Sequence, residues 1–502
     1  MQCARCDRPQ PLEIDCAAKR RECLIVEIDA ITEQSKAKTP NKNNPNYRKI
    51  FSQITEFKQK VLYLQRISIK KDVTMYKKRI LDKLLERKLK GCGAVLMEGP
   101  KWCGKTTTCE QQAMSTLYMS DPEHKSQYLR LADINIKKLL EGETPRLIDE
   151  WQVAPKFWDA IRYDVDHREG DGFYMLTGSS VPPEANKDKN QMVHSGTGRI
   201  ARLTMRPMSL FESGESNGEI SLDALFRGET EGLYSENSLD LSRIAYLICR
   251  GGWPKATLQS EDIALDRALE YFDAVANIDV SKVDGVQRDP ERVKRLMRSY
   301  ARQQGSQSAL AVIREDMLAN DSSTLDEDTV NSYIKALRKI FVIEDMHAWN
   351  PNLRSKTAIR TSDTRYYVDP SIATAALGLG PQDLINDLNT MGLFFETLCV
   401  RDLRVYADAL DGEVYHYRDK TGLECDTVLH LRNGQYGLIE IKLGGDELVN
   451  DGASALKTLA DKIDTTKMKK PSFLMVLTAT GDFAYQRKED GVFVIPIGCL
   501  RN

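Results

Sequence analysis

The chain has 502 residues, of which 41% are hydrophobic and 29% are charged. These values are ordinary for a globular protein, and the length predicts roughly three domains. The formal net charge of −2 excludes a general basic field, so any contact with nucleic acid must come from a local patch. No apolar run is long enough to span a membrane and no signal segment opens the chain, so we expect a cytoplasmic protein.

The first 74 residues differ in composition from the rest of the chain. Four cysteines lie close together at the N-terminus: Cys3, Cys6, Cys16 and Cys23. A C-x-x-C pair followed by two more cysteines is one pattern of zinc ligation, but the second pair does not form a tight knuckle. Residues 34–46 are polar and rich in lysine and asparagine, which is typical of a flexible linker. We therefore favour an extension over residues 1–74 that precedes the natural start at Met75, with zinc binding as the alternative.

Residues 99–106 (GPKWCGKT) contain the complete pattern G-x-x-x-x-G-K-[ST] of a phosphate-binding loop. The apolar run 93–98 predicts a buried parallel strand before the loop, and residues 107–118 predict a helix after it. A strand, a glycine-bounded loop and a helix N-terminus direct several backbone N–H groups and the positive end of the helix dipole to one point. The pattern therefore predicts a nucleotide site.

We expect ATP to be held by the loop and the first residues of the helix. The expected ligands are Gly99, Pro100, Lys101, Trp102, Cys103, Gly104, Lys105, Thr106 and Thr107. Within this set, Lys105 reaches the β- and γ-phosphates, and the Thr106 hydroxyl is a ligand of Mg²⁺.

An acidic pair and a further strand follow the loop. Residues 146–151 (RLIDEW) contain a short apolar strand that ends in the acidic pair Asp149 and Glu150. Asp149 is expected to hold Mg²⁺ through water, and Glu150 is expected to orient or deprotonate the attacking water. Residues 172–180 (GFYMLTGSS) are another buried-strand pattern that ends in hydroxyl residues. Polar groups at the carboxyl ends of parallel strands line the ligand crevice, so Thr177 or Ser179 is expected to sense the γ-phosphate unless it caps the following turn.

The polar segment 181–198 is typical of a mobile loop near a nucleotide, and three arginines follow it: Arg199, Arg202 and Arg206. One arginine on the γ-phosphate stabilises the charge of the transition state in phosphoryl transfer. Any of the three suits this role, within its own subunit or on a neighbouring one, and Arg199 is our candidate. At least two of them are expected to be surface ion-pair partners, and His194 is expected to be a solvent-exposed or hydrogen-bonding residue.

The middle third of the chain predicts a helical, winged-helix-like module. Helices are expected over 291–304, which has arginines at helical spacing, and over 326–340, capped by Thr324 or Asp326; strand-like segments are 341–343 and 365–368. A DNA-reading helix presents its N-terminal residues to the major groove, and here those are Asp326, Glu327 and Asp328, which phosphates repel. We therefore expect a mainly structural or protein-binding module.

The C-terminal part predicts a second site. An amphipathic helix is expected over 393–406 and carries Glu396; a strand 423–431, a turn 432–434 and a strand 436–443 follow. Glu440 and Lys442 are two residues apart and share one face of the sheet. A three-residue loop with Gly434 in the left-handed conformation places Asp426 opposite Glu440 on that face.

Carboxylates and a lysine on one face suit a divalent-metal site with a water-orienting cation, as phosphodiester hydrolysis requires. The expected metal ligands there are Glu396, Asp426 and Glu440, and the expected catalytic residues are Asp426, Glu440 and Lys442. The alternative is a retained fold whose charges solvate one edge of the sheet.

Several segments together resemble a known family. They are MYKKRILDKLL, GAVLMEGPKWCGKTTT, LIDEWQVAPKFWDAIRYDVD, FYMLTGSSVPP, HSGTGRIARLTMRPMSLFESGES and CRGGWPKA. They resemble a prokaryotic AAA-type P-loop ATPase family with a C-terminal domain of unknown function, over residues 75 to about 500. The resemblance implies an ATPase domain, a winged-helix-like middle and a nuclease-like end. The pattern Glu396, Asp426, Glu440-x-Lys442 resembles the PD-(D/E)XK nuclease fold.

The expected fold class is α/β, with a P-loop NTPase parallel sheet, a helical winged-helix-like middle domain and a small α/β nuclease-like C-terminal domain. The expected boundaries are 1–74, 75–230, 231–385 and 386–502. We expect an ATPase that uses Mg²⁺ and is coupled to a nuclease-like domain acting on DNA. The alternative is an ATP-dependent switch or interaction protein whose nuclease fold does not cut. A homo-oligomer and a protein partner of the middle domain are compatible with both.

Overall fold

The computed structural model describes residues 76–178, 196–283, 286–318, 325–351 and 362–502. Within these ranges, Lys77 to Asn502 belong to one unit, and no helix in them is both long enough and apolar enough to cross a membrane. Some residues discussed above lie outside the described ranges: Cys3, Cys6, Cys16, Cys23, Ser179, His194 and Thr324.

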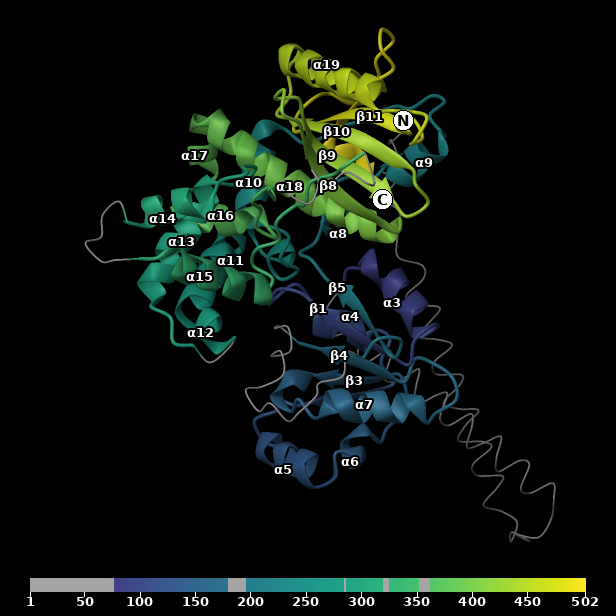
Figure 1. Ribbon diagram of the computed structural model, residues 1–502, viewed down its shortest axis with the longest axis vertical. Coiled ribbons are helices and arrows are strands. Elements are labelled where there is room, and N and C mark those ends of the chain that lie inside the picture. Colours follow the sequence, from purple (N-terminus) through teal and green to yellow (C-terminus); the bar gives the residue numbers. More distant parts are fainter. Residues whose placement is uncertain (1–75, 179–195, 284–285, 319–324, 352–361) are drawn as a thin grey trace, which may run out of the picture. The chain divides into compact units, whose positions relative to one another are not determined.

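A five-stranded parallel sheet follows helix α3 (Leu81–Leu89). Its strands are β1 (Ala94–Glu98), β2 (Ser115–Tyr118), β3 (Arg146–Asp149), β4 (Tyr174–Thr177) and β5 (Ile200–Thr204), in the order β2-β3-β4-β1-β5. The connecting helices are α4 (Lys105–Glu110), α5 (Lys125–Asn135), α6 (Lys137–Leu140), η1 (Trp151–Val153) and α7 (Phe157–Asp166) (Figure 1). Every residue of β1 and β4 is buried, as expected for central strands covered on both faces. The predicted α/β sheet is confirmed for this part.

The helix predicted over residues 107–118 is wrong in its second half. Helix α4 ends at Glu110, and residues 115–118 form the edge strand β2 beside β3. The segment Ser-Thr-Leu-Tyr is rich in residues that favour strands. The N–H of Met114 donates to Pro145 O at 2.9 Å, which begins the strand pairing. Pairing at the sheet edge therefore overrides the local helical pattern.

The middle of the chain is helical. It contains α8 (Leu210–Ser213), α9 (Leu222–Arg227), α10 (Leu241–Arg250), η2 (Ala256–Leu258), α11 (Glu261–Ala274), a π-helical turn η3 (Val275–Asp279), α12 (Val280–Lys282), α13 (Pro290–Arg302), α14 (Leu310–Leu318), α15 (Glu327–Lys339), α16 (Pro370–Leu377) and α17 (Pro381–Asn386). The two predicted long helices correspond to α13 and α15, and Asp326 caps α15 by accepting from Thr329 N. The predicted strand-like segments form only isolated bridges, such as Ile343 with Tyr367, and the winged-helix interpretation stays a prediction.

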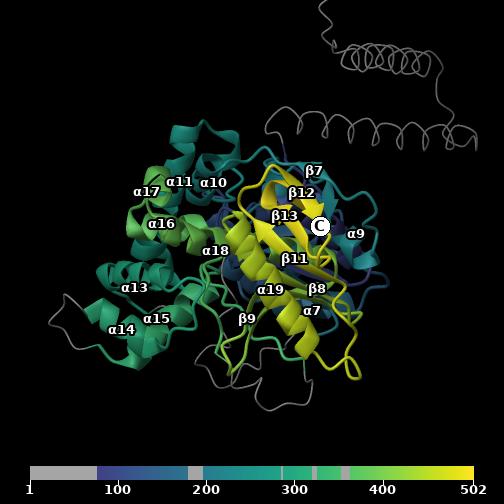
Figure 2. The same cartoon turned by 90° about the horizontal axis from the view of Figure 1, so that it is seen from above.

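The C-terminal part has a mixed seven-stranded sheet. The strands are β7 (Ser235–Glu236), β8 (Gly412–Arg418), β9 (Glu424–Leu431), β10 (Tyr436–Lys442), β11 (Phe473–Thr478), β12 (Phe483–Gln486) and β13 (Phe493–Pro496), in the order β7-β12-β13-β11-β10-β9-β8. Helix α18 (Leu388–Ala409) precedes β8 and α19 (Asp446–Lys462) follows β10, and Figure 2 shows α19 lying across the strands. Beside this sheet, β6 (Ile220–Ser221) pairs with β14 (Leu500–Arg501), which follows η5 (Ile497–Cys499). Strand β7 thus comes from a segment far earlier in the chain.

The two helices cover opposite faces of this sheet. Leu438 of β10 packs in one hydrophobic cluster with Leu456 of α19. Ile439, its neighbour on the strand, packs in another cluster with Leu398 of α18. Alternate residues of a strand point to opposite faces, so α18 and α19 flank the sheet on its two sides. The helix predicted as amphipathic is buried on nearly all faces, because α18 lies between the sheet and helices α10, α16 and α17.

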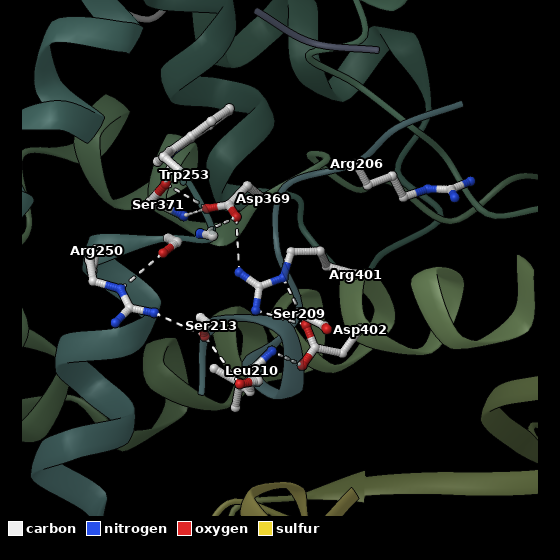
Figure 3. A network of polar contacts seen from close by, with 12 residues as sticks. Arg206, Ser209, Leu210, Ser213, Arg250, Trp253, Asp369, Ser371, Arg401 and Asp402 are labelled. Carbon is white, nitrogen blue, oxygen red and sulfur yellow. Dashed lines mark hydrogen bonds and ion pairs between the residues drawn. The ribbon is translucent and has the colours of Figure 1, made fainter. Parts of the chain in front are cut away.

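Segments far apart in the sequence meet at a buried ionic network around Arg401 of α18 (Figure 3). Arg401 Nη1 donates to Asp369 Oδ2 at 2.9 Å, and Nε donates to Asp402 Oδ1 at 2.8 Å. Asp369 also accepts from Gly252 N at 2.9 Å, and Asp402 accepts from Leu210 N at 2.8 Å. The network therefore connects α18 to the loop after α10 and to the start of α8.

Candidate functional site

The carboxyl ends of three strands lie side by side at one edge of the parallel sheet. Thr177 at the end of β4 is in register with Met97 of β1 and with Asp149 at the end of β3. Because β4 lies between β1 and β3, the loop after β1 and the acidic end of β3 meet at the same level. A ligand crevice forms at such an edge in open parallel sheets.

Two glycines allow the backbone of the phosphate loop to take its path. Gly99 has φ +143°, and a Cβ there would lie only 2.1 Å from the backbone oxygen of Met205. Gly104 has φ +100° and begins α4. L-residues rarely adopt these backbone angles, so glycine is required at both ends of the loop.

Lys105 lies over the loop that it follows. Its side chain is buried, and Nζ donates to Gly99 O at 2.9 Å and to Pro100 O at 2.7 Å. Phosphate oxygens form stronger charge-assisted hydrogen bonds with an ammonium than neutral carbonyls do. The lysine is therefore positioned to exchange loop carbonyls for phosphate oxygens.

The hydroxyls of Thr106 and Thr177 both donate to Asp149. Thr106 Oγ1 lies 2.7 Å and Thr177 Oγ1 lies 2.6 Å from Asp149 Oδ1. A hydroxyl and a carboxylate form an all-oxygen donor set, which Mg²⁺ prefers. Thr106 and Asp149, the two predicted Mg²⁺ ligands of this site, are thus brought together. Thr177 orients Asp149 here, and its predicted role of sensing the γ-phosphate stays a prediction.

Glu150 has the environment of a general base. Its φ of +55° is left-handed, which is unusual for a residue other than glycine, and its carboxylate contacts the side-chain amide of Gln152. Burial and the charge of Asp149 raise the pKa of Glu150 above its usual value. A raised pKa makes a carboxylate a better proton acceptor near neutral pH.

The structure does not bring Arg199 to the phosphate loop. Arg199 precedes β5, where Ile200 is in register with Ala94 at the opposite end of β1, and its Nε pairs with Asp166 Oδ1 at 2.7 Å. Arg199 is level with residue 93, six residues before the loop begins at Gly99, so at about 3.3 Å per residue the strand separates Arg199 from the loop by roughly 20 Å. Action of Arg199 within its own subunit is therefore not supported, and only action on a neighbouring subunit stays a prediction.

The other two arginines after the polar loop also have acidic partners. Arg202 Nη1 pairs with Glu98 Oε1 at 2.8 Å. Arg206 is buried and pairs with Glu344 Oε1 at 2.6 Å and with Asp408 Oδ2 at 2.5 Å. The expected ion-pair partners are thus present, although Arg206 is an interior residue and not a surface one.

Some contacts of the loop were not foreseen from the sequence. Lys101 Nζ pairs with Asp279 Oδ1 at 2.5 Å, and the Trp102 ring packs edge-on against Tyr271 with ring centroids 5.6 Å apart. Arg79, before α3, donates to Cys103 O at 2.9 Å. No motif marks Asp279 or Tyr271, and the segment MYKKRILDKLL, which contains Arg79, gives no sign of a contact with the loop.

The predicted cluster on β9 and β10 is assembled. The register pairs Thr427 with Ile439, so Asp426 lies opposite Glu440, and Gly434 in the turn has φ +82°. Lys442 Nζ lies 2.6 Å from Glu440 Oε2 and 3.3 Å from Asp426 Oδ2. Asp426 Oδ2 also accepts from Ile441 N at 2.8 Å. The two carboxylates and the lysine therefore lie on one face, as the strand pattern predicted.

Glu396 approaches this cluster from α18 but is engaged elsewhere. Its carboxylate accepts the hydroxyl of Tyr366, and burial and the charge of Asp426 raise its pKa well above the usual range. The same two causes raise the pKa of Glu440. Within the described ranges, no three His, Cys, Asp or Glu side chains are arranged to hold a metal ion. The structure does not therefore bring the predicted ligands Glu396, Asp426 and Glu440 together as a finished metal site.

Three stretches of the chain match models of protein families. Residues 92–213 match a family described as an AAA domain. Residues 241–383 match a domain of unknown function, DUF8612, and residues 391–500 match another, DUF4143. No curated protein matches the chain.

Three of the solved structures that match the chain are distant from it in sequence and structure. A signal transduction ATPase with numerous domains (STAND) and a tetratricopeptide repeat sensor, from Pyrococcus horikoshii, is 12% identical, with a TM-score of 0.22 over 67% of this chain and 53% of that chain. The chain thus spans about half the length of that protein. A Drosophila ORC structure bound to DNA is 12% identical, with a TM-score of 0.18 over 61% and 88% of the two chains. The Hef helicase domain of Pyrococcus furiosus is 12% identical, with a TM-score of 0.18 over 81% and 90%.

TM-scores this low support no argument about fold or function, so the family match and the sheet edge carry the assignment. The AAA match spans the phosphate loop, Asp149 and Thr177, which the parallel sheet brings to one edge. Residues 92–213 therefore match an AAA domain and have the phosphate loop and parallel sheet of a P-loop fold, which supports nucleotide binding.

Proposed function

We propose that the chain binds Mg–ATP at the carboxyl edge of the parallel sheet and hydrolyses it. The observation that carries this proposal is the hydrogen bond of 2.7 Å between Thr106 and Asp149 beside the buried Lys105. Lys105 would hold the β- and γ-phosphates, Thr106 and Asp149 would hold Mg²⁺, and Glu150 would accept a proton from the attacking water. Mg²⁺, when bound, would neutralise charge on the phosphates.

ATP turnover by two variants tests this proposal. Lys105→Ala should abolish turnover, because the triphosphate loses the cation that follows it to the transition state. Glu150→Gln should bind ATP and hydrolyse it slowly, because an amide cannot accept the proton. Lys90→Ala, which removes an exposed lysine paired with Glu86, is the matched control and should turn over ATP like the parent. Turnover by Lys105→Ala at the parent rate would contradict the assignment.

We propose as a second function that the C-terminal domain, over about residues 386–502, hydrolyses phosphodiesters of DNA with a divalent metal. The close approach of Lys442 to Glu440 and Asp426 on one sheet face supports it. Two carboxylates and a cation on a shared face suit metal-assisted attack by water. An approach of Glu396 after release from Tyr366 would complete the ligand set.

A non-cutting switch is the competing function, and two observations favour it. The Tyr366 hydroxyl already engages Glu396, and the cluster lacks a finished metal arrangement within the described residues. The first turn of α15 carries Glu327 and Asp328, which would repel a nucleic-acid backbone at that helix end. In this case ATP would change the state of the protein, and a protein partner would read that state.

Cleavage of several DNA forms with Mg²⁺ or Mn²⁺ decides between the two. If the domain cuts, Asp426→Ala and Glu440→Ala should lose cleavage and keep ATP hydrolysis, and Lys442→Ala should cut more slowly with metal still bound. Glu424→Ala is the matched control, because Glu424 lies on the same strand and pairs only with exposed Arg418 in the described contacts. Absence of cleavage by the parent with either metal would favour the switch.

A further inference from the structure

Arg79 is a buried arginine that contacts the backbone of the phosphate loop. It lies just before α3, and its side chain is only 3% exposed. Nη1 donates to Cys103 O at 2.9 Å, and Nη2 donates to Arg206 O at 2.8 Å. Its Nε donates to Glu212 Oε1 at 3.0 Å. The guanidinium therefore links the loop to the backbone that follows β5 and to the short helix α8.

Glu212 holds the guanidinium in a fixed place. Its carboxylate also accepts from Ile80 N at 2.8 Å and from Ser209 N at 2.9 Å, which closes the capping box of α8. Glu212 thus accepts hydrogen bonds from Arg79, Ile80 and Ser209, and these bonds fix the position of its carboxylate and of the guanidinium. A planar guanidinium with several donors in a rigid fork is suited to hold such a geometry, whereas a lysine ammonium is not.

The hydrogen bond from Arg79 to Cys103 O fixes the orientation of the peptide group between Cys103 and Gly104. The C=O and N–H of a trans peptide point in opposite directions. Because Arg79 holds the Cys103 oxygen on its own side, the N–H of Gly104 points away from Arg79. Backbone N–H groups turned inward at a helix N-terminus are the donors that bind a phosphate.

The cation on the other loop carbonyls cannot replace this contact. Lys105 donates to Gly99 O and Pro100 O, but these bonds must be released when Lys105 engages phosphate oxygens. Arg79 keeps its three acceptors throughout, since none of them belongs to the nucleotide. The Cys103–Gly104 peptide is therefore held by a residue that does not take part in binding.

We infer that Arg79 is a positioning residue for the phosphate loop: it orients the Gly104 N–H toward the β-phosphate without touching the nucleotide. The inference rests on the proposed ATP site. It predicts that a variant of Arg79 binds nucleotides with a β-phosphate more weakly and other nucleotides nearly as before. A general loss of fold stability does not produce this selectivity. ADP carries the β-phosphate and AMP does not, so the ratio of their affinities reports on the loop.

The test measures ADP and AMP binding to the full chain by calorimetry, at a temperature where each variant is folded by circular dichroism. For Arg79→Gln, the preference for ADP over AMP should fall about 10-fold. This is the change in affinity expected when one hydrogen bond to the charged β-phosphate is lost because its donor is no longer oriented. Arg79→Lys keeps the charge opposite Glu212 and should also lose preference, because an ammonium lacks the fork. The KM for ATP should rise more than kcat falls, since the Gly104 contact exists before and during the reaction.

Arg250→Gln is the matched control, because Arg250 is equally buried and pairs with Glu215 at 2.5 Å; it also reaches α8, at Ser213, but has no described contact with the phosphate loop or with Glu212. Its preference for ADP should equal that of the parent, even if its melting temperature falls. The inference would be overturned if both Arg79 variants kept the parent preference, or if Arg250→Gln lost it equally. A parent that binds neither ATP nor ADP would instead refute the proposed ATP site.

Discussion

Replacing Arg401 with methionine should destabilise the fold strongly, although Arg401 is far from any motif. Arg401 is 2% exposed, and the two carboxylates that it contacts, Asp369 and Asp402, are 0% exposed. Methionine fills much of the arginine's volume but supplies no charge and no donor. The variant therefore leaves two buried carboxylates without their shared cation.

The size of the effect follows from what each carboxylate keeps. Asp369 still accepts from Gly252 N at 2.9 Å and from Ser371 N at 3.0 Å, and Asp402 still accepts from Leu210 N at 2.8 Å. These bonds offset part of the loss but do not neutralise the charge. Removing one partner of a buried ion pair typically costs about 3–5 kcal/mol, and we expect Arg401→Met to fall in this range.

Equilibrium unfolding in urea, followed by circular dichroism, measures the loss. Arg227→Met is the control, because Arg227 pairs with Asp223 and Glu229 at the surface and should change stability by no more than about 0.5 kcal/mol. The double variant Arg401→Met/Asp402→Asn should be more stable than Arg401→Met, because the added amide removes one uncompensated charge. A single variant within about 1 kcal/mol of the parent, or a double variant with additive losses, would refute the reasoning.

Further predictions concern pH, close packing and the N-terminus. Burial alone would raise the pKa of Glu344, but Arg206 and Arg404 overcome it and lower the pKa to about 2 from 4.5, so the carboxylate contributes stability that is present above pH 4.5 and is lost as the pH falls toward 2. Acid unfolding of Glu344→Gln should therefore show a flatter pH dependence in that window, and an unchanged profile would contradict the assignment. Gly252→Ala should cost several kcal/mol, because a Cβ there would lie 2.2 Å from Met208 O, whereas Gly91→Ala, with 3.9 Å to its nearest neighbour, should be nearly neutral in the same urea assay. A chain starting at Met75 should melt like the full chain and hydrolyse ATP, whereas one starting at Leu81 should melt lower because it lacks Arg79; equal melting of the two would argue against the Arg79 contacts.

The sequence alone was sufficient to predict features whose geometry is set by residues close to one another in the chain. The phosphate loop, with Gly99 and Gly104 at its ends, needs particular residue types at fixed spacing, because only glycine tolerates those backbone angles. The cluster of Asp426, Glu440 and Lys442 was predictable for a similar reason. A short turn sets the strand register, and the register decides which side chains share a face.

Tertiary structure decided the features that depend on distant partners. The segment at Ser115 became an edge strand because β3 was available to pair with it. Arg199 was a reasonable candidate by its place in the chain, yet the direction of β5 leaves it at the far end of the sheet. The sequence carries no local signal for either outcome, since both depend on which strands become neighbours.

The buried arginines show the same division most clearly. Arg79, Arg206 and Arg401 lie in stretches with many other charged residues, and nothing in their local pattern separates an interior arginine from a surface one. Each is buried only because carboxylates and carbonyls from remote segments converge on it and compensate its desolvation. Residue type and spacing therefore determine the chemistry that the chain can perform, whereas the long-range packing of charged side chains decides which residues hold that chemistry in place.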